Sequence, residues 1–327
     1  MARKPRIHYA GAVYHVLLRG NAGQQIFFET ADYLRFLRFM GEGIEKYNCR
    51  VHAFCLMPNH IHMAIQVGDT PLSRIMQNLC FRYTQWMNRR RDRVGHLFQG
   101  RYKAVLVDAG SYLLELVRYI HLNPVRAGIV KSPEAYLWSS HLSYLGERKL
   151  PWLTTDWVLS RFSSSRGQPG NEYREFVHSG DEGGQKEEFH RGTKGERRVL
   201  GENPFIEEVF RRAKQERKKT PSMGEVIRRV CEQYGVEEKE LSAAGKNRRV
   251  SLVRGIIAWL ILESGELTLT ELSKRLNRDI STLSSAVKRL LILSNKDAGM
   301  DKKLEGFRHE ILEIGQLPAP PLFEGED

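Results

Sequence analysis

The sequence is poor in cysteine and lacks a long hydrophobic run. Its 327 residues include no CxxC pair, and the cysteines are dispersed at Cys49, Cys55, Cys80 and Cys231. This usage predicts reduced, mostly buried thiols and argues against a disulfide framework or a zinc site built on paired cysteines. The longest apolar stretch, around Gly255 to Leu262, is too short to cross a bilayer, and the pattern of residues leads us to expect no signal peptide. We therefore expect a soluble, cytoplasmic protein.

Acidic residues are in deficit. Lysine and arginine number 51 against 39 aspartates and glutamates, which gives a formal net charge of +12 and a pI near 9.6. Such an excess predicts a polyanionic partner, with nucleic acid as the first candidate, and a nucleoid-associated location. A basic surface with no specific ligand is the alternative.

Two histidines separated by one isoleucine stand in an apolar stretch, Leu56 to Ile65. Its alternation after a Pro-Asn turn signal predicts a buried strand, on which His60 and His62 point to the same face. Two parallel imidazoles on a stiff element are a plausible start to a divalent-metal site. A pair that only makes hydrogen bonds is the alternative.

The first half of the chain alternates between strand and helix patterns. Period-2 and helical spacings predict strand, helix, strand, strand, helix, strand, helix, at 12–18, 30–40, 50–57, 60–65, 71–88, 104–107 and 111–123. The last helix should stop before Pro124, because proline disfavours helical geometry in the preceding residue. This order favours an α+β domain with a compact antiparallel sheet and helices on one side.

Tyr119 and Asn123 lie four residues apart and should share a face of that last helix, whereas His121 points elsewhere. Two imidazoles and the Asn123 amide oxygen can hold Mg²⁺ or Mn²⁺ loosely and leave room for water and phosphate oxygens. A tyrosine is a suitable nucleophile for a phosphodiester, because its ester can be resealed. Its ordinary pKa near 10 requires activation by the metal or by a base that the sequence does not identify. Tyr112 is a competing nucleophile on the same helix.

The second half of the chain predicts a linker and a helical unit. The boundaries are 1–160 for the first domain, 161–200 for a flexible linker rich in Gly, Ser and charged residues, 201–295 for the helical domain and 296–327 for a tail. A hydrophobic helix at 248–264 precedes a capping box at Thr268–Glu271 and two short helices joined at Asn277–Asp279. These features predict a helix-turn-helix, with a plain helical bundle as the alternative.

Basic and polar side chains extend the nucleic-acid prediction to both domains. The run Arg89 to Arg93 is either a solvated face or a phosphate contact. We expect DNA contacts in the first domain from Arg19, Arg89, Arg90, Arg91, Arg101 and Lys103. In the second domain we expect them from Arg248, Arg278, Asp279, Ser281, Thr282 and Lys288.

The first domain resembles a known family over about residues 5–145. The stretch 56–62 is similar to the paired-histidine motif of IS200-type single-tyrosine transposases, and 119–128 resembles the tyrosine helix of their REP-associated branch. The resemblance implies a ferredoxin-like HUH endonuclease domain that cuts and rejoins single-stranded DNA near hairpins through a 5′-phosphotyrosine. It implies Tyr119 as nucleophile and His60, His62 and Asn123 as metal ligands, although other branches carry glutamine in the last place.

Residues 205–292 resemble the DNA-binding C-terminal domain of the replication initiator DnaA. Arg278, Asp279, Ser281 and Thr282 match the family's base-contacting turn, and Ile280 replaces its histidine. The chain has no GxxxxGK[ST] loop, so the ATPase part of that initiator is absent.

Our leading hypothesis is thus a metal-dependent transposase acting on single-stranded and hairpin DNA, with a tethered domain that binds duplex DNA. The sequence leaves open a homodimer in which the tyrosine acts in cis or in a partner subunit. A non-catalytic DNA-binding regulator that recognises hairpins is the alternative. An RNA-binding sheet would need aromatics on strands, and here they fall mainly on helices.

Overall fold

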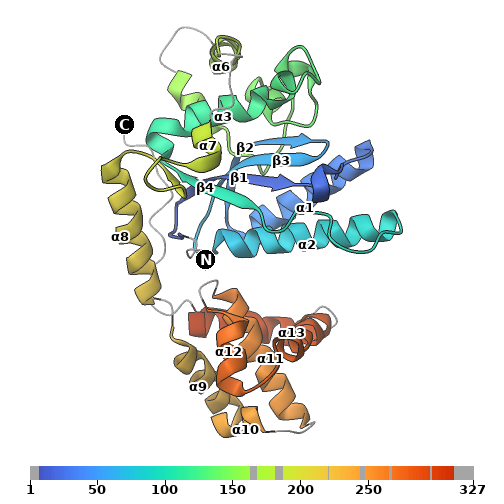
Figure 1. Cartoon of the computed structure of the whole chain (residues 1–327), viewed down its shortest axis with the longest axis vertical. Coiled ribbons are helices and arrows are strands. Elements are labelled where there is room, and N and C mark those ends of the chain that lie inside the picture. Colours follow the sequence, from blue (N-terminus) through green and yellow to red (C-terminus); the bar gives the residue numbers. More distant parts are fainter. Residues whose placement is uncertain are drawn as a thin grey trace. The chain divides into compact units, whose positions relative to one another are not determined.

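A computed structural model describes residues 7–162, 168–180, 187–219, 221–243, 247–264, 267–294 and 297–312 (Figure 1). The chain divides into two compact units, one ending at Arg212 and the other beginning at Ala213. Within the described ranges, no helix is long and apolar enough to cross a membrane.

The first unit is built on a five-stranded sheet with the order β2-β3-β1-β4-β5. The strands are β1 (Val13–Arg19), β2 (Arg50–Met57), β3 (His60–Gln66), β4 (Lys103–Val107) and β5 (Val199–Leu200). The first four pair antiparallel, as the sequence predicts, and β5 adds a short parallel edge to β4. The predicted α+β class is confirmed, with this parallel strand as a difference at one edge.

Helices cover both faces of this sheet (Figure 1). Because side chains alternate along a strand, Met63 and Ile65 face α1 (Thr30–Tyr47) and α2 (Leu72–Arg90). On the opposite face, the alternate strand residues pack with α3 (Ala109–Arg126). The prediction of helices on one side holds for α1 and α2, the helices of the ferredoxin-like βαββαβ unit. The later helix α3 builds a second layer, and the candidate site lies beneath it.

Helix α3 continues through Pro124 to Arg126, three residues beyond the predicted end at Asn123. Proline has no N–H, so it cannot donate to the Ile120 carbonyl as a helical residue normally does. The Asn123 side chain supplies a donor instead, with its Nδ2 3.4 Å from the Ile120 oxygen and 2.8 Å from the Tyr119 oxygen. Side-chain donors therefore let the helix pass through its proline.

Much of the predicted flexible linker at 161–200 is ordered structure on the first unit. It contains α6 (Pro169–His178), α7 (Glu187–Arg191) and β5, and the rings of Tyr173 and Phe189 are fully buried. The flexible-linker prediction is wrong for these residues, because a few large aromatics anchor a segment whose composition is otherwise polar. Residues 163–167 and 181–186 lie outside the described part of the chain. The remaining short elements of this unit are 3-10 turns at Asn21–Gly23, Pro133–Ala135 and Ser160–Phe162, and helices α4 (His141–Tyr144) and α5 (Asp156–Leu159).

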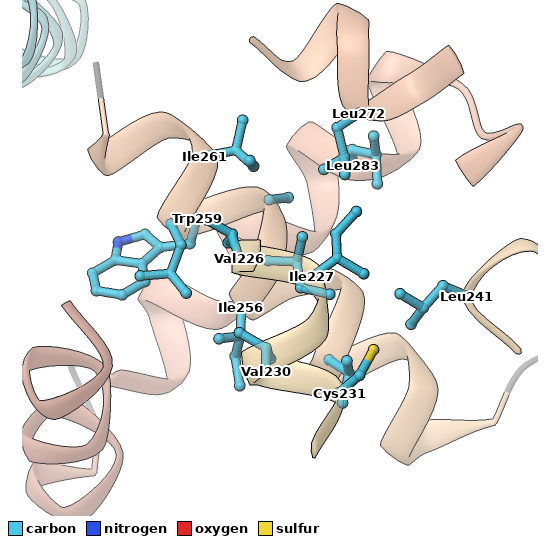
Figure 2. Close-up of a cluster of buried hydrophobic side chains, with 14 of the residues drawn as sticks. Val226, Ile227, Val230, Cys231, Leu241, Ile256, Trp259, Ile261, Leu272 and Leu283 are labelled. Atoms are coloured by element: carbon cyan, nitrogen blue, oxygen red, sulfur yellow. The ribbon is translucent and has the colours of Figure 1, made fainter. Parts of the chain in front are cut away.

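The second unit is all helical and is organised around α11 (Arg248–Glu263). Figure 2 shows Ile256, Trp259 and Ile261 of this helix among apolar side chains from its neighbours. The sequence of α11 is apolar around most of the helix circumference, and the helix is therefore buried on nearly all sides. The surrounding helices are α9 (Met223–Tyr234), α10 (Glu238–Ser242), α12 (Leu269–Leu276), α13 (Ile280–Ser294) and α14 (Ala298–Phe307). The division between the two units falls within α8 (Asn203–Lys219).

Part of the predicted tail belongs to this second core. Leu304 and Phe307 of α14 and Ile311 of the following turn, Arg308–Leu312, are buried in the same cluster. The Phe307 ring stacks on Tyr234 with a centroid distance of 5.9 Å. The predicted boundary at 296 is therefore wrong for residues 297–312, and the rest of the predicted tail, 313–327, lies outside the described residues.

The predicted helix-turn-helix forms from α12 and α13. Thr268 Oγ1 accepts from the Glu271 N–H, and Glu271 accepts from the Thr268 N–H, so the capping box is present. Asn277 ends α12 in a left-handed conformation, with φ at 47°. Asparagine tolerates this geometry better than most residues, which permits the tight turn into α13.

Candidate active site

The structure brings the predicted histidine pair and the predicted tyrosine together. His60 and His62 lie on the α3 face of β3, with ring centroids 5.1 Å apart. The Tyr119 ring of α3 lies 5.9 Å from the His62 ring, in an edge-on arrangement. Residues distant in sequence thus converge beneath α3.

A third histidine, His15, determines which ring nitrogen of His62 carries the proton. His15 of β1 lies with Nδ1 2.7 Å from the Phe189 carbonyl oxygen and Nε2 3.0 Å from His62 Nδ1. Burial lowers the pKa of His15 to about 4, so its imidazole is neutral near pH 7. A carbonyl only accepts, so Nδ1 of His15 carries the proton and its Nε2 accepts from His62 Nδ1–H. His62 is left with an unprotonated Nε2.

The same argument applies to His60. Asn59 donates through Nδ2 to the Gly23 carbonyl at 3.2 Å, which orients its Oδ1 toward His60 Nδ1 at 2.7 Å. His60 Nδ1 therefore donates to that oxygen, and Nε2 keeps its lone pair. Burial, followed by the nearby Arg19 and His190, lowers the pKa of His60 to about 4. Both histidines of the pair are therefore neutral, and among the described residues neither Nε2 has a hydrogen-bond partner.

This donor set fits a divalent cation. A metal-bound histidine normally donates its other ring N–H to an oxygen or other acceptor, as His60 does to Asn59 and His62 to His15. Among the described residues, no group of three or more His, Cys, Asp or Glu side chains could hold a metal ion. A third ligand must then come from another residue type, such as the Asn123 amide, from water or from DNA. Asn123 uses Nδ2 for the carbonyls of α3, and Oδ1 is the atom suited to coordination.

Tyr119 is enclosed on several sides and is only 3% exposed. Its ring packs on Phe189, with centroids 5.2 Å apart, and the Arg126 guanidinium carbon lies 5.0 Å from the ring centre. Burial raises the pKa of the phenol above its ordinary value of 10, while Arg126 and a hydrogen bond with Asn123 oppose that rise. The hydroxyl oxygen lies 2.6 Å from Nε2 of His190.

The other candidates on α3 lie elsewhere. Tyr112 lines a separate open depression with Glu187, Glu188 and Arg191. His121 is buried, with Nδ1 2.5 Å from the Tyr173 hydroxyl and Nε2 2.6 Å from Ser140 Oγ. The structure therefore places Tyr119, rather than Tyr112, against the paired histidines.

Basic side chains border the histidine pair. Arg19 ends β1 directly opposite His60 in the strand register, and Lys103 begins β4 opposite Leu17. Both are exposed, as is Arg101. Among these, the Arg19 guanidinium is near enough to help lower the pKa of His60, which is itself only partly buried.

The arginines at the end of α2 are arranged differently. Arg90 lies 2.6 Å from the Glu29 carboxylate, and Arg91 lies 3.2 Å from Glu29 and 3.3 Å from Asp32. These contacts join α2 to the start of α1, so Arg90 and Arg91 have structural partners. Arg89 is exposed.

In the second unit, most of the predicted DNA contacts are exposed. Asp279, Ser281 and Thr282 lie at the start of α13, and Lys288 is seven residues after Ser281 on the same face. Arg248 is exposed at the start of α11. Arg278 instead donates to the Ala243 carbonyl at the end of α10.

Three contributors to the site are absent from the sequence-based prediction. His15 lies in a strand whose sequence has a period-2 pattern. Its position in that pattern could have indicated that its side chain faces the same side of the sheet as Val13 and Leu17. Phe189 and His190 fall in a stretch dominated by Gly, Glu, Lys and Arg, and no local signal predicts that α7 reaches Tyr119. Only the tertiary structure reveals them.

Comparisons with known proteins match two parts of the chain to known families. Residues 8–123 match the family model of IS200-like transposases, and residues 223–290 match that of the bacterial DnaA helix-turn-helix. Among curated proteins, none matches the chain significantly. A solved structure of a REP-associated tyrosine transposase bound to a REP hairpin is 16% identical, with a TM-score of 0.40, and the match covers 47% of this chain and 98% of that one. The chain thus carries an IS200-like transposase domain followed by a helix-turn-helix domain of the bacterial DnaA type.

Proposed function

We propose that the protein is a metal-dependent, single-tyrosine DNA endonuclease and strand-transfer enzyme of the HUH class. In this proposal it cleaves single-stranded DNA near hairpins and rejoins it through a 5′-phosphotyrosine. The observation that carries it is the contact of the Tyr119 ring with His62, while the free Nε2 atoms of His60 and His62 are available to one cation. Nucleophile and metal ligands thus come from α3 and β3 of one domain.

The chain's own residues account for the covalent step. The Tyr119 oxygen attacks the scissile phosphorus, and the 3′ oxygen leaves and becomes a 3′-hydroxyl. Attack by another 3′-hydroxyl on the phosphotyrosine reverses the step and reseals the strand. Arg19 and Lys103 bind the backbone phosphates beside His60 and position the target strand.

His60, His62 and Asn123 would hold Mg²⁺ or Mn²⁺. When bound, such a cation polarises the phosphodiester and offsets charge on the leaving oxygen. His15 and Asn59 keep the two imidazoles in the tautomer that binds a metal.

The helix-turn-helix domain would direct this activity to duplex DNA. The exposed start of α13 combines hydrogen-bonding side chains, Ser281 and Thr282, with the positive end of a helix dipole. A tethered duplex-binding domain raises the effective concentration of the nuclease domain near its target.

Covalent trapping on a hairpin oligonucleotide with a single-stranded flank tests the proposal. With Mn²⁺ or Mg²⁺, the wild type and Tyr112→Phe should form a denaturation-resistant protein–DNA adduct, and Tyr119→Phe should form none while still binding the DNA. His60→Ala should lose metal-dependent cleavage. Adducts in Tyr119→Phe, or cleavage that is indifferent to chelator, would refute the assignment.

A non-catalytic DNA-binding regulator is the second candidate. The low exposure of Tyr119 favours it, because a nucleophile must reach the phosphorus. The same assay separates the two: a regulator binds the hairpin with wild-type affinity in Tyr119→Phe and forms no adduct in any variant.

A further inference from the structure

We propose that His190 is a catalytic residue that accepts the proton of Tyr119 during cleavage and returns it during rejoining. This inference rests on the proposed function and identifies the base on which that mechanism depends. His190 lies outside residues 8–123, the range of the matched transposase family model.

The contact between the two side chains is direct. The phenol oxygen lies 2.6 Å from His190 Nε2, so the hydroxyl donates to that nitrogen when the imidazole carries its own proton on Nδ1. This is the separation expected of a general base and the proton that it removes. The rings meet edge-on, with centroids 5.7 Å apart.

The segment that supplies His190 is held firmly in place. Phe189, the preceding residue, is fully buried, and its carbonyl accepts from His15 Nδ1 at 2.7 Å. Helix α7 thus makes two consecutive contacts with the site: the Phe189 carbonyl accepts from His15, and the His190 ring contacts the Tyr119 hydroxyl. The neighbouring histidines have other roles, since His15 and His62 bond each other.

The proton and electron balance is complete with these groups and water. As the bond between the Tyr119 oxygen and phosphorus forms, the phenolic proton moves to His190 Nε2. The bond from phosphorus to the 3′ oxygen breaks with its electron pair on that oxygen, which takes a proton from water. In rejoining, a 3′-hydroxyl loses its proton to water and attacks phosphorus, and the imidazolium returns its proton to the departing phenolate.

The same hydrogen bond has a competing interpretation. A contact that only restrains Tyr119 would hold the phenol away from DNA, and its removal would then speed the reaction. A base makes the opposite prediction, because removing the imidazole that contacts the phenol oxygen would slow the reaction.

Two variants of equal shape decide between these roles. In full-length protein with Mn²⁺ and a hairpin oligonucleotide, His190→Gln should slow single-turnover adduct formation by on the order of 10²–10⁴-fold. His190→Glu has the same shape but a basic carboxylate, and should recover at least tenfold over His190→Gln. His178→Gln is the matched control, since His178 is exposed and bonds Glu134 at 2.8 Å, and it should react at the wild-type rate.

A substrate with sulfur in place of the bridging 3′ oxygen shows whether a variant is slow in deprotonating the phenol or in releasing the leaving group. Thiolate leaves readily without a cation, so this substrate should restore much of the rate of His60→Ala but leave His190→Gln slow, because the phenol must still lose its proton. Equal rates for the Glu and Gln variants, a Gln variant as fast as wild type or faster, or recovery of His190→Gln on the sulfur substrate would overturn the inference. Adduct formation by Tyr119→Phe would instead refute the proposed function itself.

Discussion

Nε2 of His15 accepts a hydrogen bond from Nδ1 of His62 across a distance of 3.0 Å. This bond makes the protonation of a candidate metal ligand depend on a residue of a neighbouring strand, and through it on the Phe189 carbonyl of α7. The chain of contacts links three separate segments to one nitrogen, Nε2 of His62. Its consequences can be tested individually.

Replacing His15 should weaken metal binding even though no ligand is lost. In His15→Leu, His62 Nδ1 has no acceptor and the ring is free to change tautomer, so Mn²⁺ affinity should fall by about 10- to 100-fold. His52→Leu is the control, because His52 is also buried and its Nε2 lies 3.1 Å from Oε1 of Gln66, at the opposite end of β3 from His60. Electron paramagnetic resonance of free Mn²⁺ measures both. Unchanged Mn²⁺ affinity in His15→Leu would show that the hydrogen bond from His62 to His15 does not support metal binding.

Two substitutions of Asn123 should distinguish its role as a metal ligand from its role in stabilising α3. Asn123→Asp keeps an oxygen for the cation but loses the donor to the Tyr119 and Ile120 carbonyls, while Asn123→Ala loses both. Denaturant unfolding should show a free energy lower by about 1 kcal/mol or more in each variant. Mn²⁺ titration should show weakened binding only in Asn123→Ala. Equal affinities for the two variants would remove Asn123 from the ligand set.

Phe189 should be a stability determinant of the first unit. Its ring is fully buried against Tyr119, so Phe189→Ala should lower the unfolding free energy by about 3–5 kcal/mol. Phe81→Ala is the matched control, because Phe81 is 54% exposed and should cost little. If both variants unfold at the same denaturant concentration, α7 is not docked on the sheet in solution.

Stability of the first unit should fall on acidification partly through His52. Burial lowers the pKa of His52 from 6.5 to about 4 in the folded state. As the pH falls, His52 is protonated in the unfolded chain near pH 6.5 but in the folded protein only near pH 4. The free energy of unfolding is therefore highest above pH 6.5 and decreases by roughly 3 kcal/mol between pH 6.5 and about 4. His52→Gln should flatten the pH dependence of the unfolding free energy over that interval. An identical slope in both proteins would exclude His52 as the cause.

Lys288 should contribute a phosphate contact in duplex binding. Its exposed side chain lies on the face of α13 that carries Ser281. Lys288→Ala should weaken binding to all duplex sequences alike and reduce the slope of log affinity against log salt by about one. Lys302→Ala, which removes an exposed lysine from α14, should leave the slope unchanged. A sequence-dependent loss in Lys288→Ala would indicate a base contact instead.

The sequence predicted those parts of the site that depend on local periodicity. Alternation around His60 and His62 and the helical spacing of Tyr119 and Asn123 sufficed, because strand and helix geometry determine which side chains share a face. The ion pairs of Arg90 and Arg91 with Glu29 and Asp32 needed the packing of α2 against α1.

The predicted linker shows where composition alone fails to predict structure. Phe189 and His190 lie among polar residues whose average composition predicts flexibility. A single buried ring nevertheless docks α7 on the sheet, and a short helix anchored by tertiary contacts leaves little signal in sequence. Helix α3 likewise continues past Pro124, where the Asn123 side chain donates to the Ile120 carbonyl that the proline cannot serve.

Peptide mapping of the trapped protein–DNA adduct tests the central claim most directly. Full-length protein is reacted with a hairpin oligonucleotide and Mn²⁺, digested with protease and nuclease, and the nucleotide-bearing peptide is identified by mass spectrometry. We predict one modified residue, Tyr119, joined to the 5′-phosphate of the cleaved strand. Modification of any other residue, or recovery of all the DNA without attached peptide, would contradict the account.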